Sequence, residues 1–270
     1  MVSSIALVLL STALAFGGWC DEEKNPIETE EAWKDATYYF DGSEKAIGWQ
    51  YLEVMDDGVP RDYWFYFGNN GKKAFADDCD LKDRAIDGRH YAFDSDGRML
   101  SGWQFVGDTE DDDSDIALWR WYCPDETSKD YGTRKDYGWV WDVPSEAVDE
   151  SGYNDELSHW YYLKSGGKPV HGRFETIKNK KYCFDFSGQM TGGIRWIEFD
   201  ENGEIMSISQ DLLEASDLLN EYINYDTTGM GKTGLYYFGQ KEDSASYGAM
   251  KGGKQTVTID GEKKRIEFKK

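Results

Sequence analysis

The fold can be predicted from the stretch Trp160-Tyr161-Tyr162-Leu163-Lys164-Ser165-Gly166-Gly167. Its first four residues are aromatic or aliphatic, a composition that favours a β-strand, and the two glycines then allow the chain to reverse. The stretch therefore predicts one strand and the turn of a β-hairpin. A single hairpin is barely stable in water, so a stable fold needs the pattern to recur.

The pattern does recur along the chain. Aromatic groups followed by polar, glycine-containing turns begin at Tyr38, Phe65, Tyr91, Tyr182, Trp196 and Tyr236. A glycine followed by a ring accompanies several copies: Gly48-Trp49, Gly102-Trp103, Gly138-Trp139 and Gly172-Arg173-Phe174. Stacked hairpins bury the rings of one repeat against the next. The sequence therefore predicts an all-β fold, a solenoid of stacked β-hairpin repeats.

Loops and one helix interrupt these repeats. Residues 107–115 form an acidic run that is typical of a solvated loop. Between residues 210 and 225, apolar residues recur at helical spacing, and Ser209 is a candidate N-cap. The apolar residues are Leu212, Ala215, Leu219 and Tyr222. We expect one amphipathic helix here, packed on or between blocks of repeats.

These observations divide the chain into five segments. They are a signal peptide at 1–15, an N-terminal linker at 16–35, a hairpin repeat block at 36–206 with an insertion around 107–158, a helical interruption and link at 207–233, and a second repeat block at 234–270. Repeat stacks need polar capping units, and the chain stops after Phe268-Lys269-Lys270 without one. We therefore expect a fragment of a longer protein.

The N-terminus indicates the compartment. An apolar run from Ile5 ends in Ala13-Leu14-Ala15, the small-x-small pattern that a signal peptidase accepts. We expect cleavage before Phe16 and a secreted protein associated with the cell wall or cell surface. The run lacks a preceding basic residue, so a buried N-terminal strand or helix is the alternative. Trp19 stands where lipoprotein signals carry a small residue, which argues against a lipid anchor on Cys20.

Charge limits the partners. The chain has 52 acidic and 30 basic residues and a formal net charge of −22. Such a surface repels nucleic acid, whose binding requires Lys and Arg to displace counterions. The run from Ile5 to Ala15 is too short to span a bilayer, and no later segment is apolar enough. We therefore expect neither a nucleic-acid partner nor a membrane span.

Four cysteines, Cys20, Cys79, Cys123 and Cys183, allow three full disulfide pairings in an exported protein. Their wide spacing matches no local zinc motif. Cys123 and Cys183 lie inside strand-like aromatic runs, where a buried free thiol is the alternative. Both interpretations stay open.

Local signs of catalysis or metal binding are weak. The three histidines show no HExxH spacing, and there is no Gly-x-Ser-x-Gly motif. The turns at 94–97 and 200–203 resemble calcium loops but lack the ligand ladder of an EF-hand, and turn chemistry explains their Asp, Asn and Gly. We expect no enzyme activity, no cofactor and no metal.

The repeats resemble the cell-wall-binding repeats of Gram-positive surface proteins, the family that includes choline-binding and glucan-binding modules. The match is to Gly-Trp, a spacer, Trp-Tyr-Tyr-aliphatic, a turn and Gly-x-Met, and it runs from about Tyr38 to the C-terminus. The resemblance implies a β-hairpin superhelix with ligand sites between neighbouring hairpins. It also implies a cell-wall polymer or glycan as partner, with choline groups and sugars both open.

Carried over by position, the Gly-Trp member survives at Trp49, Trp103 and Trp139. Two pairs with a following leading tryptophan are complete, Trp49 with Trp64 and Trp139 with Trp160. Tyr66 and Tyr162 are the expected third walls. The leading tryptophan also survives at Trp196, and in the other units this position is Thr37, His90, Lys181 or Leu235. Rings hold a quaternary ammonium through their negative faces, and the same faces stack on sugars.

Two other functions remain as alternatives. Paired carboxylates among the 52 acidic residues could make a glycan-cleaving enzyme that uses the repeats for targeting. The repeats could also be a purely structural surface spacer whose rings serve only packing. We prefer a non-catalytic extracellular binding module.

Overall fold

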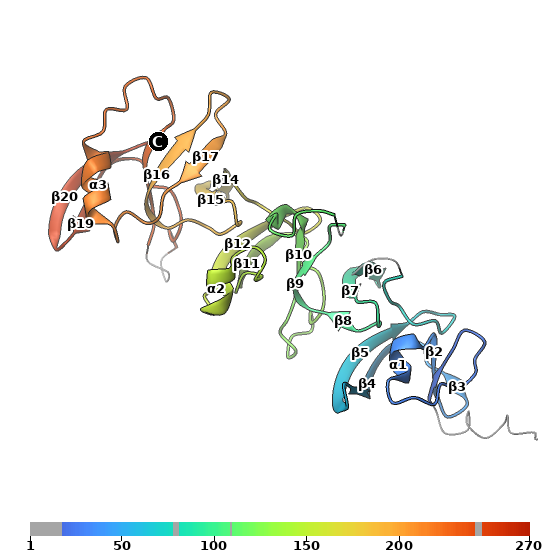
Figure 1. The fold of residues 1–270 in the computed structure, drawn as a ribbon. Coiled ribbons are helices and arrows are strands. Elements are labelled where there is room, and N and C mark those ends of the chain that lie inside the picture. The colour runs from blue at the N-terminus through green and yellow to red at the C-terminus, as the bar shows by residue number, and fades with distance from the viewer. Residues whose placement is uncertain (1–17, 78–80, 109, 241–244) are drawn as a thin grey trace, which may run out of the picture. The chain divides into compact units, whose positions relative to one another are not determined.

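The computed structural model describes residues 18–77, 81–108, 110–240 and 245–270 (Figure 1). The regular secondary structure of these residues is mostly short β-hairpin sheets, with few helices, so the expected all-β class is confirmed. The stacking of all hairpins into one solenoid stays a prediction. The expected signal peptide at 1–15 lies outside the described residues.

The strands are β1 (Gly18–Cys20), β2 (Tyr38–Asp41), β3 (Glu44–Lys45), β4 (Gly48–Asp56), β5 (Val59–Phe67), β6 (Lys82–Ile86), β7 (Arg89–Phe93), β8 (Met99–Leu100), β9 (Gly102–Phe105), β10 (Trp119–Tyr122), β11 (Gly138–Asp142), β12 (His159–Lys164), β13 (Lys168–Pro169), β14 (Arg173–Ile177), β15 (Lys180–Phe184), β16 (Gly193–Phe199), β17 (Ile205–Ile208), β18 (Gly234–Phe238), β19 (Gly253–Ile259) and β20 (Glu262–Phe268). The helices are α1 (Ala32–Asp35), α2 (Glu150–Asn154), α3 (Ser216–Ile223) and a 3₁₀ turn, η2 (Ile116–Leu118). None of the helices in the described ranges is long and apolar enough to cross a membrane.

The chain forms two compact units. One comprises residues up to 111 together with 120–135, and the other comprises 112–119 and 136–270. The first contains the sheets β1-β2-β3, β4-β5 and β6-β7-β8, and the second contains β11-β12-β13, β14-β15, β17-β16-β18 and β19-β20. The boundary falls inside the segment 107–158 that the sequence marks as an insertion. The division into repeat blocks stays a prediction.

Tight turns close the hairpins where the sequence places Asp, Asn and Gly. Asp57-Gly58 between β4 and β5 has φ values of 51° and 74°, and Asp87-Gly88 between β6 and β7 has 49° and 78°. Two consecutive positive φ angles define the type I′ turn, whose twist matches that of the flanking strands. Lys178-Asn179 and Asp260-Gly261 have the same pair of signs. These turns set the strand registers described below.

Alternation along each aromatic strand separates two sets of rings. In β5, Phe65 and Phe67 are fully buried, whereas Trp64 and Tyr66 are half-buried. Successive side chains in a strand point to opposite faces, so one set fills the core and the other covers the second face. In β12, Tyr161 and Leu163 are also fully buried, and on the other face Trp160 is half-buried while Tyr162 is buried. The aromatic triplets therefore serve two faces at once.

Within the expected linker at 16–35, the described residues from Gly18 onward include a strand and a short helix. β1 pairs with β2, and Cys20 lies opposite Tyr38 in the register. The Trp33 side chain is 1% exposed, and its Nε1 donates a hydrogen bond to the Met55 carbonyl at 2.7 Å. The described part of this segment belongs to the fold because a buried tryptophan and a strand edge both gain partners there.

The helix is shorter than the apolar spacing predicts. α3 begins at Ser216, and the Ser209 Oγ accepts a hydrogen bond from the Trp196 backbone N–H at 2.9 Å in place of capping a helix. The Asp211 carboxylate accepts from the backbone N–H groups of Ile194 and Leu213, both at 3.0 Å. These bonds hold the start of the expected helix as a turn at the sheet edge, which explains the later start.

The C-terminal repeat block is not separate in the sheet. β18 pairs with β16, with Leu235 opposite Trp196 and Phe238 opposite Gly193. Residues 234–238 therefore complete the sheet of the preceding block, and only β19 and β20 form a hairpin of their own. α3 lies between β16 and β18 in the sequence, yet the two strands pair. This pairing buries the Phe238 side chain of β18 completely.

Three cysteines of the described ranges are free thiols: Cys20, Cys123 and Cys183. Cys20 and Cys183 are buried, and burial raises the pKa of the Cys183 thiol to about 12. Cys20 and Cys183 are thus buried free thiols, whereas the free thiol Cys123 is only partly buried. Cys79 lies outside the described residues.

Candidate aromatic binding sites

The hairpin β4–β5 gathers four rings on one face. Trp49 lies opposite Tyr66 and Tyr51 lies opposite Trp64 in the register. Trp49 and Tyr51 are two residues apart in one strand, as are Trp64 and Tyr66 in the other, so all four side chains point to the same side. Strand period and register together bring the expected pair Trp49 and Trp64 into contact.

The rings form two walls that meet nearly at right angles. The Trp49 and Trp64 centroids are 6.2 Å apart, with an interplanar angle of 82°. Tyr91 of β7, in the next hairpin, lies 4.7 Å from Trp49. Phe93 lies 5.8 Å from Trp49 on the same hairpin as Tyr91, with an interplanar angle of 25°. These are ordinary distances for aromatic packing, and they fix the orientation of Trp49.

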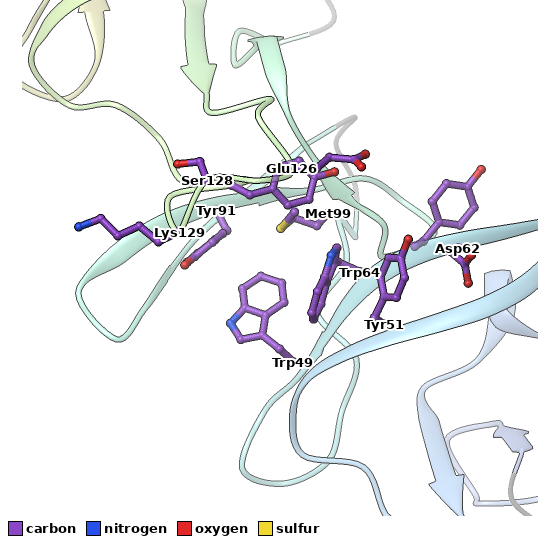
Figure 2. Close-up of a pocket in the computed structure, with 11 residues that line it drawn as sticks. Trp49, Tyr51, Asp62, Trp64, Tyr91, Met99, Glu126, Ser128 and Lys129 are labelled. Atoms are coloured by element: carbon purple, nitrogen blue, oxygen red, sulfur yellow. The ribbon is translucent and has the colours of Figure 1, made fainter.

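A cavity of about 480 Å³ opens beside these walls. Figure 2 shows Trp49 and Trp64 side by side, with Tyr91 and Met99 across from them. The charged residues that line it are Asp62, Glu126 and Lys129, and Lys129 directs its ammonium away from the tryptophan rings (Figure 2). We call Trp49, Trp64 and Tyr91 the first cage.

Tyr66, the expected third wall, has a different place. Its ring contacts Trp49 at 5.2 Å but is not among the residues that line the cavity. The Arg84 guanidinium lies over the Tyr66 ring at 5.3 Å. Tyr91 takes the third side instead, because it comes from the hairpin that packs against Trp49. The sequence held a sign of this, since Tyr91 is the first ring of the next aromatic triplet.

The second unit contains the same arrangement. Trp139 lies opposite Tyr162, and Trp141 lies opposite Trp160. The Trp139 centroid is 6.0 Å from that of Trp160, at 87°, and 5.1 Å from that of Tyr182 in the next hairpin. We call Trp139, Trp160 and Tyr182 the second cage. Tyr162 contacts Trp139 at 5.0 Å, as Tyr66 contacts Trp49.

The two cages agree closely in geometry. The tryptophan–tryptophan distances are 6.2 and 6.0 Å, and the distances to the next hairpin's tyrosine are 4.7 and 5.1 Å. Tyr51 and Trp141 occupy equivalent positions beside the leading tryptophans and are 56% and 46% exposed. Sequence reasoning missed Tyr51 and Trp141, although their spacing of two from Trp49 and Trp139 places them on the same face.

The remaining tryptophans of the repeat pattern lie elsewhere. Trp103 is half-buried in β9, which pairs with β10, so it lies outside the hairpins that form the two cages. Trp196, at a leading position, is 3% exposed and stacks on Tyr222 of α3 at 4.5 Å and 16°. A leading tryptophan is thus not by itself evidence of a site, because α3 covers this one.

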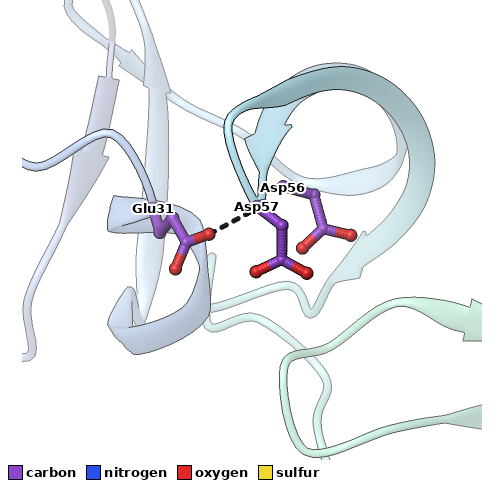
Figure 3. A group of neighbouring side chains, drawn as sticks. All are labelled: Glu31, Asp56 and Asp57. Atoms are coloured by element: carbon purple, nitrogen blue, oxygen red, sulfur yellow. Dashed lines mark hydrogen bonds between the residues drawn. The ribbon is translucent and has the colours of Figure 1, made fainter.

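Three carboxylates, those of Glu31, Asp56 and Asp57, lie close together (Figure 3). The Glu31 carboxylate accepts a hydrogen bond from the Asp57 backbone N–H at 2.9 Å, which lowers the pKa of Glu31 together with the Lys34 ammonium. The Tyr63 hydroxyl donates to Asp56 at 2.7 Å and is the main cause of the lowered pKa of Asp56. Lys34 bridges Glu31 and Asp56, at 3.1 and 3.4 Å. We interpret the group as a hydrogen-bonded ion pair network between α1 and the β4–β5 turn.

The two turns that resemble calcium loops use their aspartates for the backbone. The Asp94 carboxylate accepts from the backbone N–H groups of Asp96 and Arg98, at 3.0 and 2.8 Å. The Asp200 carboxylate accepts from the Glu204 N–H at 2.8 Å. An aspartate that bonds its own turn in this way stabilises a tight reversal. These contacts support turn chemistry as the reason for the residues.

The fold and these clusters define a class: a β-hairpin repeat protein with aromatic cages between neighbouring hairpins. No family model matches the chain. No curated protein matches it either. Among solved structures, the chain is similar to choline-binding proteins, the family type that its repeats resemble.

Choline-binding protein F from Streptococcus pneumoniae is 20% identical, with a TM-score of 0.39 over 84% of this chain and 82% of that chain. CbpJ from Streptococcus pneumoniae is 20% identical, with a TM-score of 0.40 over 84% of this chain and 77% of that chain. The Cpl-1 endolysin, complexed with a peptidoglycan analogue, is 20% identical, with a TM-score of 0.31 over 70% of this chain and 49% of that chain. At these scores the ligand has to be inferred from the residues of this chain.

Proposed function

We propose that the protein is a non-catalytic binding module that holds quaternary ammonium groups, such as choline on a cell-wall polymer, in its two cages. The observation that carries the proposal is the cavity walled by Trp49, Trp64 and Tyr91. The same three-ring geometry recurs at Trp139, Trp160 and Tyr182. The repeated ring geometry supports a ligand site, and packing alone would not require the open cavity beside the first cage.

Electrostatics favours a cation over a neutral ligand at the first cage. Ring faces carry negative quadrupole density, so rings that meet near a right angle attract one cation from two sides. Asp62 and Glu126 line the same cavity. The net charge of −22 attracts cationic groups over a longer range. A trimethylammonium group also desolvates easily, because its charge lies behind methyl groups.

The cavity also has room for what carries the ammonium. Its volume of about 480 Å³ falls in the range of small-molecule sites, and the exposed Tyr51 ring extends the wall beyond Trp64. A sugar of a wall glycan could stack on Tyr51 or Trp141. We therefore propose a wall polymer or glycan outside the cell as the partner, with choline as the group that each cage recognises.

The test is calorimetric titration of the full chain with choline, in 0.5 M salt so that the net charge does not drive adsorption. We expect two sites. Trp64→Leu and Trp160→Leu should each weaken one site by on the order of 1–2 kcal/mol, which is about ten-fold in affinity. The double variant should lose both. Tyr153→Ala, an exposed ring on α2 outside both cages, is the control and should bind normally.

Two results would contradict the proposal. One is normal choline binding by the Trp64→Leu, Trp160→Leu double variant. The other is an absence of choline binding in a chain that binds neutral gluco-oligosaccharides, which would make the cages sugar platforms. Turnover of peptidoglycan or glucan that a single Asp or Glu substitution abolishes would instead support the glycan-cleaving alternative.

A further inference from the structure

A third hairpin repeats the cage register with different residues. In β14–β15, Phe174 lies opposite Cys183 and Thr176 lies opposite Lys181. Phe174 therefore stands where Trp49 and Trp139 stand, and Lys181 takes the place of the leading tryptophan. The next triplet supplies Tyr236, 5.2 Å from Phe174, at the position of Tyr91 and Tyr182. This hairpin therefore has the same arrangement of positions as a cage, but a lysine replaces one of the aromatic rings.

Lys181 excludes a cationic ligand from this copy. Its ammonium lies over the Phe174 ring at 4.5 Å from the centroid. The lysine thus places its own charge on the ring face where the other cages would hold an ammonium group. A second cation would meet a like charge at short range. The ligand preference of this copy must therefore differ from that of the two cages.

A cavity of about 650 Å³ opens at this hairpin, and its lining is mainly cationic and aromatic. Arg173, Lys181, Lys232 and Lys270 line it, together with one acidic residue, Glu204. This local surplus of positive charge stands in a protein of net charge −22. Charge of one sign gathered in a concave site raises the local concentration of ligands of the opposite sign.

The cations are available to a ligand to different degrees. The Arg173 guanidinium lies 3.6 Å from the Glu175 carboxylate, which Lys164 also approaches at 3.1 Å. Lys232 lies over the Phe199 ring at 5.8 Å. Within the described ranges, no carboxylate lies within 4.0 Å of the Lys181 or Lys232 ammonium. An anion that enters the cavity can therefore approach either ammonium group without displacing an ion pair.

Three rings in mutual contact form the apolar side of the same cavity. The Phe174 and Phe199 centroids are 6.1 Å apart at 12°, and Tyr236 lies 5.2 Å from Phe174 and 6.2 Å from Phe199. All three line the cavity. An aromatic wall beside positive charges suits a molecule with an apolar ring face and an anionic group.

We propose that this cavity is a separate site for an anionic saccharide, a sugar that carries a phosphate or a carboxylate. The anion pairs with Lys181 and Lys232 through charge-assisted hydrogen bonds, and Arg173 adds a planar donor pair. The sugar ring packs against the aromatic side of the cavity. The site shares no residue with either cage, so the inference does not depend on choline binding.

The test uses the full chain at 0.1 M salt, with glucose 6-phosphate, glucuronate, glucose and inorganic phosphate as separate probes. We expect saturable binding of at least one of the two anionic sugars, at least ten-fold tighter than glucose and tighter than inorganic phosphate. The two anionic sugars distinguish phosphate from carboxylate. Lys181→Met and Lys232→Met should each reduce this binding at least five-fold and leave the choline titration unchanged.

Lys254→Met is the matched control, because this exposed lysine lies on β19 and does not line the cavity. Methionine keeps the apolar stem of lysine, and the melting temperature of each variant reports whether it folds. If Lys181→Met lowers the melting temperature, Lys232→Met alone decides the result. Equal binding of glucose and of both anionic sugars, or full binding of the anionic sugars by folded Lys232→Met, would overturn the proposal.

Discussion

At the scale of single residues, the same ring packs against its neighbours and lines the candidate site. Trp49 contacts Phe93 of the neighbouring hairpin at 5.8 Å and at the same time lines a cavity. Trp64 contacts the rings of Trp49 and the exposed Tyr51. Trp49, in contrast, also contacts rings of the next hairpin. For this reason Trp64 is the better residue for testing binding with little effect on the core.

The buried Lys73 predicts an unusual pH dependence of stability. Its ammonium donates to the carbonyls of Trp33, Lys34 and Asp96, and burial lowers its pKa to about 8. The unfolded chain, with an ordinary lysine pKa of 10.5, binds a proton that the folded chain releases above pH 8. Stability from this group therefore rises with pH between about 8 and 10.5.

Urea unfolding at pH 7, 8, 9 and 10 measures this effect. The free energy of unfolding of the parent, minus that of Lys73→Met, should rise by up to roughly 1.4 kcal/mol per pH unit above pH 8. The difference between the two proteins removes the contributions of cysteine and tyrosine ionisation, which both share. A difference that stays flat over this range would show that Lys73 has an ordinary pKa in the folded protein.

At the scale of elements, the hairpin turn and the stacking of hairpins set the positions of the side chains. The Asp57-Gly58 turn fixes the register that places Trp49 opposite Tyr66 and Tyr51 opposite Trp64. A slip of one residue would move all four rings to the other face. The cages therefore depend on turn residues that never contact a ligand.

Two glycines allow the backbone contribution to be measured. Gly58 and Gly97 have φ values of +74° and +88°, where an alanine is strained by about 1–2 kcal/mol. A Cβ at Gly58 would meet nothing within 4 Å, whereas a Cβ at Gly97 would lie 2.9 Å from the Ala74 carbonyl oxygen. We expect Gly97→Ala to be more destabilising than Gly58→Ala.

Urea unfolding of the two glycine variants checks this order. Gly58→Ala should cost only the strain of its φ angle. Gly97→Ala should cost roughly 1–3 kcal/mol more, because a backbone atom cannot move away as a side chain does. Equal losses in the two variants would mean that the loop around Ala74 yields freely.

At the scale of the whole molecule, each compact unit has its own core and its own cage. The first unit packs around Trp33, Phe65 and Phe67, and the second contains a cluster around Trp196, Leu212 and Leu219. Trp196 contacts Tyr222 and Tyr225 of its own unit. A loss of packing in one unit should therefore leave the cage of the other intact.

Trp196→Ala tests this separation. Removal of a tryptophan that is 3% exposed should cost about 3–5 kcal/mol of stability in the second unit. Scanning calorimetry should show the loss, and the choline site of the first cage should keep its affinity in the same variant. Loss of both choline sites below the melting temperature would show that the units fold together.

The features that can be predicted from the sequence alone are local ones. Turn residues and alternating rings act over a few positions, so the hairpins and the juxtaposition of Trp49 with Trp64 and of Trp139 with Trp160 could be predicted. Local pattern fails to predict the structure around Trp33, which is buried in the core. It also fails before α3, where the Asp211 carboxylate accepts two backbone hydrogen bonds and delays the start of the helix.

The identity of the third ring in each cage depends on the tertiary structure. Tyr91 and Tyr182 complete the cages because a neighbouring hairpin packs against Trp49 and Trp139, and Tyr66 is left outside the cavity. The role of Lys181 also emerges only when its register position and its 4.5 Å contact with Phe174 are known. Contacts between hairpins depend on how whole strands stack, and no short stretch of sequence contains that information.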